Sequence, residues 1–216
     1  MEREYTLGLY EKSMPSDLSW EQKMLSAKAA GFDYIEIRFD CIKDYLKEHT
    51  LEELADWFKN HRLKPWAYNT LLFFNQRDEA GKREIDEETE FIMEVSKAIG
   101  MKMLITVPAF DVKDTFHFHE MCSKLEDLKA ADGNKIFAYH LNDCEDLPLG
   151  SCGDDKRLWP GEGVVDHEGI ASALKEIGFD GVCTIEEFRP EYYEMSHDEN
   201  VKKAAEVTRE FVNKYF

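Results

Sequence analysis

The sequence predicts an α/β fold in which parallel strands and helices alternate around a barrel-like sheet. Apolar runs rich in β-branched and aromatic residues alternate with stretches of helical period along the first half of the chain. Two of those helical stretches begin with a capping box, at Ser19–Gln22 and at Thr50–Glu53. This alternation implies parallel strands joined by right-handed crossovers. A chain of 216 residues with 43% apolar content can bury one core, so we expect a single domain over residues 1–216.

The expected elements follow one another in chain order. Strands are predicted at Tyr5–Tyr10, Tyr34–Phe39, Lys64–Tyr68, Met103–Val107, Lys135–Leu141 and Val182–Glu187. After the two capped helices, further helices are predicted at Glu84–Ile99, near Glu120–Ala131, after Asp166 and from about Glu199. A closed barrel of alternating strands and helices has eight strands, so the six predicted strands are too few to close one.

The stretch ITVPAFDVKDTFHFHE, Ile105–Glu120, breaks the alternation. The strand that contains Ile105 is followed by His117 without room for a crossover helix, which needs roughly a dozen residues between strand ends. Residues Ala109–His119 are therefore either a bent continuation of the preceding strand or an irregular seventh strand. By this count we expect about six to seven parallel strands, where a closed barrel has eight.

Composition limits the classes of partner. The formal charge of −18 opposes binding to nucleic acid and to anionic membranes. A neutral small molecule such as a sugar or polyol is the easier partner. There is no apolar run of membrane-spanning length, and the first residues do not form a signal peptide, so we expect a cytoplasmic protein. The five cysteines form no C-x-x-C pair and are expected to be reduced: Cys41, Cys122, Cys144, Cys152 and Cys183.

Acids and imidazoles stand at the ends of three predicted strands. Asp114 lies three residues before His117, His140 ends the apolar run KIFAYH, and Glu186 ends VCTIE. Two carboxylates and an imidazole that meet at one edge of a parallel sheet are the ligands expected for Zn²⁺ or Mn²⁺, with Mg²⁺ and Co²⁺ as alternatives. The sequence therefore predicts a metal-centred site. The remaining histidines are expected to be structural: His49, His61, His119, His167 and His197.

Two further groups have a functional and a structural interpretation. Glu36 and Arg38 alternate within YIEIRF and point to one face, where they either contact a ligand or form an internal ion pair. Trp159 begins the loop WPGEG, and Arg157 precedes it by two residues. The ring could stack on a sugar face while the guanidinium binds its hydroxyls, or the loop could simply be packed on the surface.

The assembled stretches resemble the xylose-isomerase-like TIM-barrel superfamily of sugar isomerases and epimerases, and within it the inosose isomerases (2-keto-myo-inositol isomerases). The resemblance covers most of the chain and implies a TIM-type (βα) barrel, here shortened or incomplete. The stretches that carry it are FDYIEIRFD, KPWAYNTLLFFNQRDEAGKREI, DTFHFHEM, ADGNKIFAYHLNDCEDLPLG, DKRLWPGEGVVD, ALKEIGFDGV and IEEFRPEYYEM.

The resemblance implies a divalent metal at the mouth of the barrel, held by a Glu, an Asp, a His and a second Glu. The last three correspond to Asp114, His140 and Glu186, while substrate-binding positions correspond to His117, Arg157 and Glu36. In such enzymes two metal-bound glutamates transfer a proton between carbons beside a ketone, and the metal steadies the enediolate. Glu186 is then the catalytic residue on one side of the substrate.

The chain departs from this family between its VP and D-x-F-H segments, so the resemblance implies a barrel shortened by an internal deletion of about two βα units, with the deletion seam near residues 108–114. Family members have there a helix, the strand that bears the first glutamate ligand, another helix and most of a further strand, whereas this chain has only Ala109–Lys113. The first glutamate has no counterpart, so we expect impaired isomerase activity. One alternative is a non-catalytic polyol-binding protein, or a homo-oligomer that covers exposed barrel edges. A weaker alternative is an abasic-site endonuclease-like phosphodiesterase, which the acidic charge disfavours.

Overall fold

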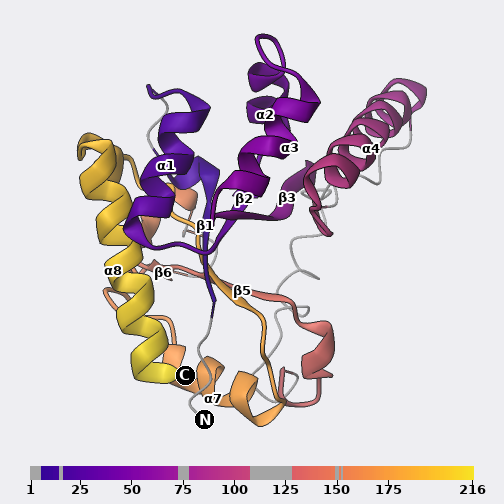
Figure 1. The fold of residues 1–216 in the computed structure, drawn as a ribbon. Coiled ribbons are helices and arrows are strands. Elements are labelled where there is room, and N and C mark those ends of the chain that lie inside the picture. The colour runs from indigo at the N-terminus through magenta and orange to yellow at the C-terminus, as the bar shows by residue number, and fades with distance from the viewer. Residues whose placement is uncertain (1–5, 15–16, 73–77, 108–127, 149–150, 152) are drawn as a thin grey trace. The chain divides into compact units, whose positions relative to one another are not determined.

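The computed structural model describes residues 6–14, 17–72, 78–107, 128–148, 151 and 153–216. The chain divides into two compact units, one formed by Met1–Phe32 with Glu120–Phe216 and the other by Asp33–His119 (Figure 1). Among the described residues, each unit contains three parallel strands that are hydrogen-bonded to one another. The predicted α/β class with parallel strands is confirmed.

The first unit is built around β8, which lies between β1 and β5. Its strands are β1 (Leu7–Tyr10), β5 (Ala138–Leu141) and β8 (Val182–Ile185). Every residue of β1 and β8 is buried, as expected for parallel strands covered on both faces, and Thr184 is the buried polar residue of β8. The helices are α1 (Trp20–Ala30), α7 (His167–Glu176) and α8 (His197–Tyr215), with 3₁₀ turns η1 (Glu11–Ser13), η3 (Gly133–Lys135), η4 (Asp154–Lys156) and η5 (Pro190–Glu194).

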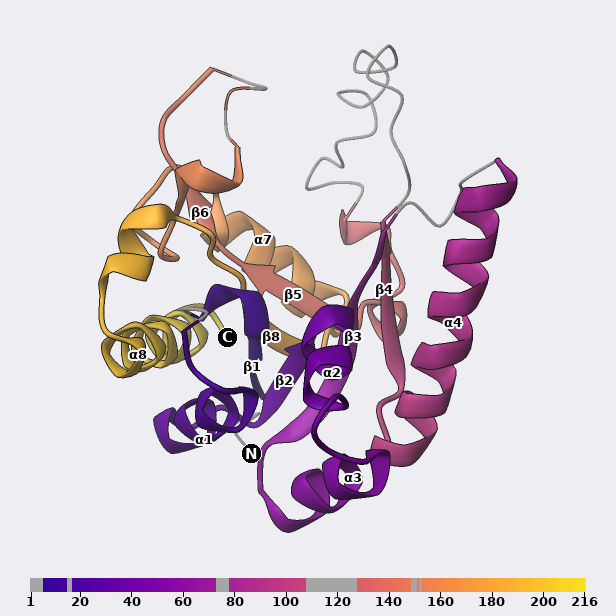
Figure 2. The same ribbon diagram turned by 90° about the horizontal axis from the view of Figure 1, so that it is seen from above.

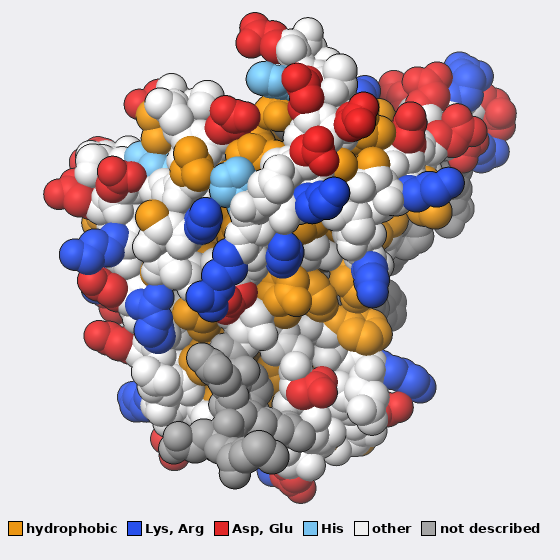
Figure 3. Space-filling model, viewed as in Figure 1, with side chains coloured by type: hydrophobic (Ala, Val, Ile, Leu, Met, Phe, Trp, Pro, Cys, Tyr) orange, Lys and Arg blue, Asp and Glu red, His pale blue; other side chains and the backbone are white. Residues whose placement is uncertain are grey.

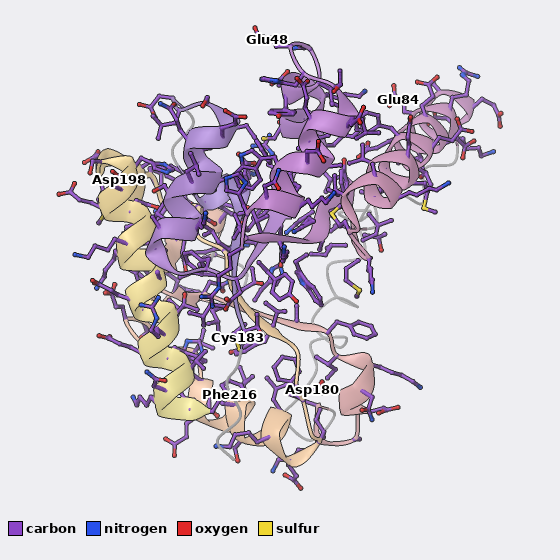
Figure 4. The ribbon with its side chains drawn as sticks, viewed as in Figure 1. Glu48, Glu84, Asp180, Cys183, Asp198 and Phe216 are labelled. Carbon is purple, nitrogen blue, oxygen red and sulfur yellow. The ribbon has the colours of Figure 1, made fainter. Side chains whose placement is uncertain are left out.

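Helix α8 covers this sheet and lies beside α1 (Figure 2). Its capping box is formed by Ser196 and Glu199, and its apolar stripe faces β1 and β8. Asp198 and Phe216 mark the two ends of the helix in Figure 4, where Cys183 is labelled on β8. Burial raises the pKa of the Cys183 thiol to about 12, so this cysteine is an inert core residue.

The second unit has β3 at the centre of its sheet, between β2 and β4. Its strands are β2 (Tyr34–Ile37), β3 (Lys64–Leu72) and β4 (Met103–Val107), and its helices are α2 (Phe39–Tyr45), α3 (Leu51–Asn60) and α4 (Glu79–Ile99). Helix α4 packs against β3 and α3, and acidic side chains gather over its outer surface (Figure 3).

Most predicted elements occupy their expected places. Both predicted capping boxes are present, at Ser19 and Thr50, and Asp166 caps α7. The structure corrects several boundaries. Strand β3 continues to Leu72, and helix α2 begins at Phe39, where the predicted strand was expected to end. The predicted helix near Glu120–Ala131 and the irregular segment Ala109–His119 fall largely or wholly outside the described residues.

A short antiparallel hairpin was not predicted. Strands β6 (Asp143–Cys144) and β7 (Arg157–Leu158) pair with each other inside the stretch expected to be a long loop. The pair brings Arg157 opposite Cys144, only a few residues after the end of β5. It therefore places a cation near the carboxyl ends of the first unit's strands.

Candidate functional site

The carboxyl ends of β5 and β8 bring His140 and Glu186 together. His140 lies opposite Thr184 in the parallel register, and the amide of Glu186 donates to the carbonyl of Leu141, which keeps the strands in step to their ends. The His140 Nδ1 atom lies 3.3 Å from Glu186 Oε2. Side-chain exposures of 28% and 14% leave both groups accessible from the sheet edge.

Arg157 holds the same carboxylate from the other side. One guanidinium nitrogen, Nη1, donates to Glu186 Oε2 at 2.9 Å and to the Glu186 carbonyl at 3.0 Å. The other, Nη2, donates to Asp154 at 2.7 Å, and the guanidinium lies over the Phe188 ring at 4.5 Å. Within the described part of the chain, Glu186 Oε1 has no hydrogen-bond partner. That oxygen is available to a ligand.

The charge balance keeps Glu186 ionised. Burial acts to raise its pKa, but the hydrogen bond and charge of His140 and the charge of Arg157 outweigh burial, so the pKa lies below its ordinary value. An ionised carboxylate is the form that binds a metal cation or accepts a proton.

The His140–Glu186 pair fits a metal ion by its donor chemistry and by its spacing. An imidazole nitrogen and a carboxylate oxygen are common zinc ligands, and two ligand atoms about 2.0–2.2 Å from a tetrahedral ion lie roughly 3.3–3.6 Å apart. The observed separation of 3.3 Å falls within that range. No group of three or more potential metal ligands occurs among the residues that the structure describes. The predicted third ligand, Asp114, and the predicted substrate-binding His117 lie outside those residues.

Behind the site, a buried carboxylate organises the loop that follows β7. Asp143 is 1% exposed and accepts backbone N–H bonds from Cys144, Gly161 and Val165, each at 2.9 Å. Burial acts to raise its pKa, but these backbone donors outweigh burial and lower it. The Asp143 Oδ2 atom also lies 3.2 Å from His167 Nε2.

His167 continues this network away from the site. Its Nδ1 atom lies 3.2 Å from the hydroxyl of Tyr139, and burial, the largest cause, raises the pKa of that phenol. A neutral imidazole satisfies both partners, because Nε2–H can donate to Asp143 while Nδ1 accepts from Tyr139. The ring is 3% exposed and packs edge-on against Phe211. His167 is therefore structural, in agreement with the sequence-based expectation.

Trp159 and Glu36, both predicted to bind substrate, are buried. Trp159 is 3% exposed and stacks on Tyr192 with ring centroids 4.3 Å apart, so its substrate contact stays a prediction. Glu36, in the second unit, is 0% exposed and accepts a hydrogen bond from Asn69 at 2.8 Å. Arg38 forms an ion pair with Asp40. The substrate contact predicted for Glu36 likewise stays a prediction.

Sequence reasoning missed the buried acids Asp143 and Glu187 near the candidate site. The loop WPGEG, which carries Gly161 and Gly163, needs acceptors for its backbone N–H groups. Asp143, in the stretch HLND, accepts the one from Gly161. Glu187 is 1% exposed, and neither of its carboxyl oxygens has a hydrogen-bond partner among the described residues. No pattern in the sequence distinguishes Glu187 from its neighbour Glu186.

Known proteins resemble this chain over most of its length. Inosose isomerases of Bacillus licheniformis and Bacillus velezensis are 40% and 38% identical over 250 aligned positions, which cover 86% of this chain and 90% and 89% of those relatives. Because the chain has only 216 residues, those relatives contain segments without a counterpart here. The crystal structure of the IolI protein with a bound zinc atom matches with a TM-score of 0.88 and 34% identity, covering 98% of this chain and 99% of that one.

The model of a protein family also matches part of this chain. The xylose isomerase-like TIM barrel family matches residues 112–211, which include the ends of β5 and β8 and the loop between them. Identity well above 30% to relatives that the chain covers almost completely confirms the resemblance recognised in the sequence. The chain belongs to the xylose isomerase-like TIM barrel family.

Proposed function

We propose that this protein is a metal-dependent isomerase that moves a proton between carbons adjacent to the ketone of a ketoinositol or related ketose. The observation that carries the proposal is the His140–Glu186 pair at the carboxyl ends of adjacent strands, with the spacing of two metal ligands. The inosose isomerases among its relatives and the zinc atom in the IolI structure support this choice of reaction and cofactor.

His140, Glu186 and Asp114 would hold the metal, and Glu186 would also act as the base. A divalent cation held there, Zn²⁺ or Mn²⁺, would supply Lewis-acid stabilisation for the charge that develops on the ketone oxygen. Glu186 is ionised, and its Oε1 atom accepts no bond from the described residues, so it can take a proton from the neighbouring carbon. Arg157 keeps that carboxylate oriented through Oε2 and the main-chain carbonyl.

We propose that turnover is slower than in the relatives. The resemblance provides no counterpart for the glutamate on the opposite side of the substrate, and loss of one acid/base partner typically costs on the order of 100-fold to 10,000-fold in rate. His117 and Arg157 are proposed to contact the substrate hydroxyls. Arg157 has a further role through its contact with Glu186.

The proposal is tested by metal analysis together with isomerisation of 2-keto-myo-inositol. We expect about one divalent metal per chain after loading, measured by plasma mass spectrometry, and a slow, metal-dependent isomerisation followed by NMR. Glu186→Gln should abolish turnover, and His140→Ala should weaken metal binding by about 10-fold to 100-fold or more.

Glu194 provides a matched control, because it is an exposed glutamate in the same segment of the chain. Glu194→Gln should leave both metal content and turnover unchanged. Turnover by Glu186→Gln at the rate of the unaltered protein would contradict the assignment of Glu186, and absence of bound metal at millimolar supply would contradict the metal site.

A further inference from the structure

Asp143 is a buried carboxylate that binds the loop after β7, the strand that carries Arg157. Residues Asp143 and Cys144 form β6, which pairs with β7, and Cys144 lies directly opposite Arg157 in that pair. The Asp143 side chain then collects N–H bonds from the loop beyond β7, at Gly161 and Val165. Asp143 thus pairs with Leu158 beside Arg157 and binds the loop that follows it.

The loop is shaped to fit this carboxylate. A Cβ atom on Gly163 would lie 2.4 Å from Asp143 Oδ1 and 2.2 Å from the Cys144 carbonyl, so only glycine fits at that point. The Val164 amide donates to the same Cys144 carbonyl at 3.2 Å. His167, at the start of α7, closes the network from the far side at 3.2 Å.

Arg157 connects the segment beside Asp143 to the candidate site. Arg157 is the residue of β7 whose guanidinium contacts Glu186, at 2.9 Å, and the arginine side chain is 20% exposed. A long arginine side chain has many rotamers, so its contact with Glu186 depends on where its backbone is held. Among the described residues no hydrogen bond joins the Asp143 side chain to Glu186, whereas the loop that Asp143 binds follows directly on β7, which carries Arg157.

We propose that Asp143 is a positioning residue, which holds the β7 loop so that Arg157 clamps the carboxylate of Glu186. The importance of that clamp for isomerisation rests on the proposed function, whereas the clamp itself does not. Replacing one carboxylate oxygen by an amide, in Asp143→Asn, sets a donor against the loop's backbone N–H groups. The loop then shifts, and the Arg157 guanidinium no longer contacts the carboxylate of Glu186.

The test is a double-mutant cycle between Arg157→Met and Glu186→Gln, measured by urea unfolding of the full-length chain with EDTA present. The chelator keeps metal ions from competing for Glu186. In the unaltered background we expect the two substitutions to be non-additive by about tenfold in the unfolding equilibrium constant. In the Asp143→Asn background the non-additivity should fall below about twofold, because the clamp is already lost.

A residue that merely stabilised the fold would lower every midpoint and leave the non-additivity unchanged, and that outcome would overturn the proposal. Should Asp143→Asn not fold, Gly163→Ala displaces the same loop with the carboxylate intact and should also abolish the coupling. Asp166→Asn, an exposed change in the same loop, should preserve it. Loss of the coupling in that control would equally contradict a specific role for Asp143.

Kinetics separate this proposal from the proposed function. If the protein isomerises 2-keto-myo-inositol, Asp143→Asn should lower kcat by a factor no larger than Arg157→Met does, and should cause no further loss when it is added to Arg157→Met. If no variant has activity, the unfolding cycle still decides whether Asp143 positions Arg157. A full second loss of kcat in the double variant would refute the shared pathway.

Discussion

Replacement of Glu187 by glutamine should stabilise the protein at neutral pH, although it removes a charged residue type. Glu187 is 1% exposed, and both its carboxyl oxygens lack hydrogen-bond partners among the described residues. Its backbone is held in place, since its amide donates to Ser13 Oγ at 2.9 Å. Burial raises the pKa of this carboxyl to about 9, and the positive charge of Arg157 offsets only part of that effect.

The sign of the pH dependence follows from the raised pKa. The ordinary value of 4.5 applies to the unfolded chain, so the folded state binds a proton that the unfolded state releases above that pH. The contribution of this group to stability is complete below pH 4.5 and is lost as the pH rises through about 9. At pH 7 the accumulated loss is about 3 kcal/mol, and glutamine, which is neutral and of similar size, avoids it.

Thermal and urea unfolding at pH 5, 6, 7 and 8, with EDTA present, measures this difference. We expect Glu187→Gln to match the unaltered protein near pH 5 and to exceed it increasingly above, by about 6–12 °C in Tm at pH 7. The exposed Glu194→Gln serves as control and should show no such trend. A difference between Glu187→Gln and the unaltered protein that is independent of pH would refute a protonated Glu187.

Other parts of the first unit give three further predictions. The ring nitrogens of His197 lack partners among the described residues, and burial lowers the pKa of this imidazole, so the protein should lose stability as the pH falls below about 6.5. His197→Phe should reduce that loss in thermal melts between pH 7 and pH 5. Ser196→Ala removes the capping box of α8 and should cost about 1 kcal/mol in urea unfolding. Gly8→Ala places a Cβ atom 2.3 Å from Thr184 Oγ1 and should cost about 1–3 kcal/mol, whereas a neutral result would contradict the close packing of β1 on β8.

Local signals in the sequence predicted the elements that local interactions determine. The capping boxes at Ser19 and Thr50 are formed by residues three apart, and the apolar strand Met103–Val107 was predicted with its observed bounds. By contrast, β3 extends to Leu72 because it pairs with β4 as far as Val107. The pairing of Asp143 with Leu158 is also non-local, and no local periodicity signals it.

The sequence predicted the part of the candidate site that lies at the ends of strands. His140 and Glu186 both follow apolar runs, and parallel strands bring their carboxyl ends to one edge of the sheet. The substrate contact expected of Arg157 stays a prediction, and the sequence did not predict that its guanidinium contacts Glu186 and Asp154. That outcome depends on the fold of the intervening loop, where the decisive carboxylate of Asp143 is satisfied by backbone groups far along the chain.

Glu186 and Glu187 show most clearly what residue identity leaves open. Successive residues of an extended segment point to opposite sides, so two identical side chains at the end of β8 enter different surroundings. Glu186 meets His140 and Arg157, which lower its pKa, whereas Glu187 enters a buried region that raises its pKa to about 9. At neutral pH the first is therefore an anion suited to a metal or a proton, and the second is a neutral acid in the core. A slip of one residue in the register of β8 would exchange these states, so the packing of β8 between β1 and β5 decides which glutamate can do chemistry.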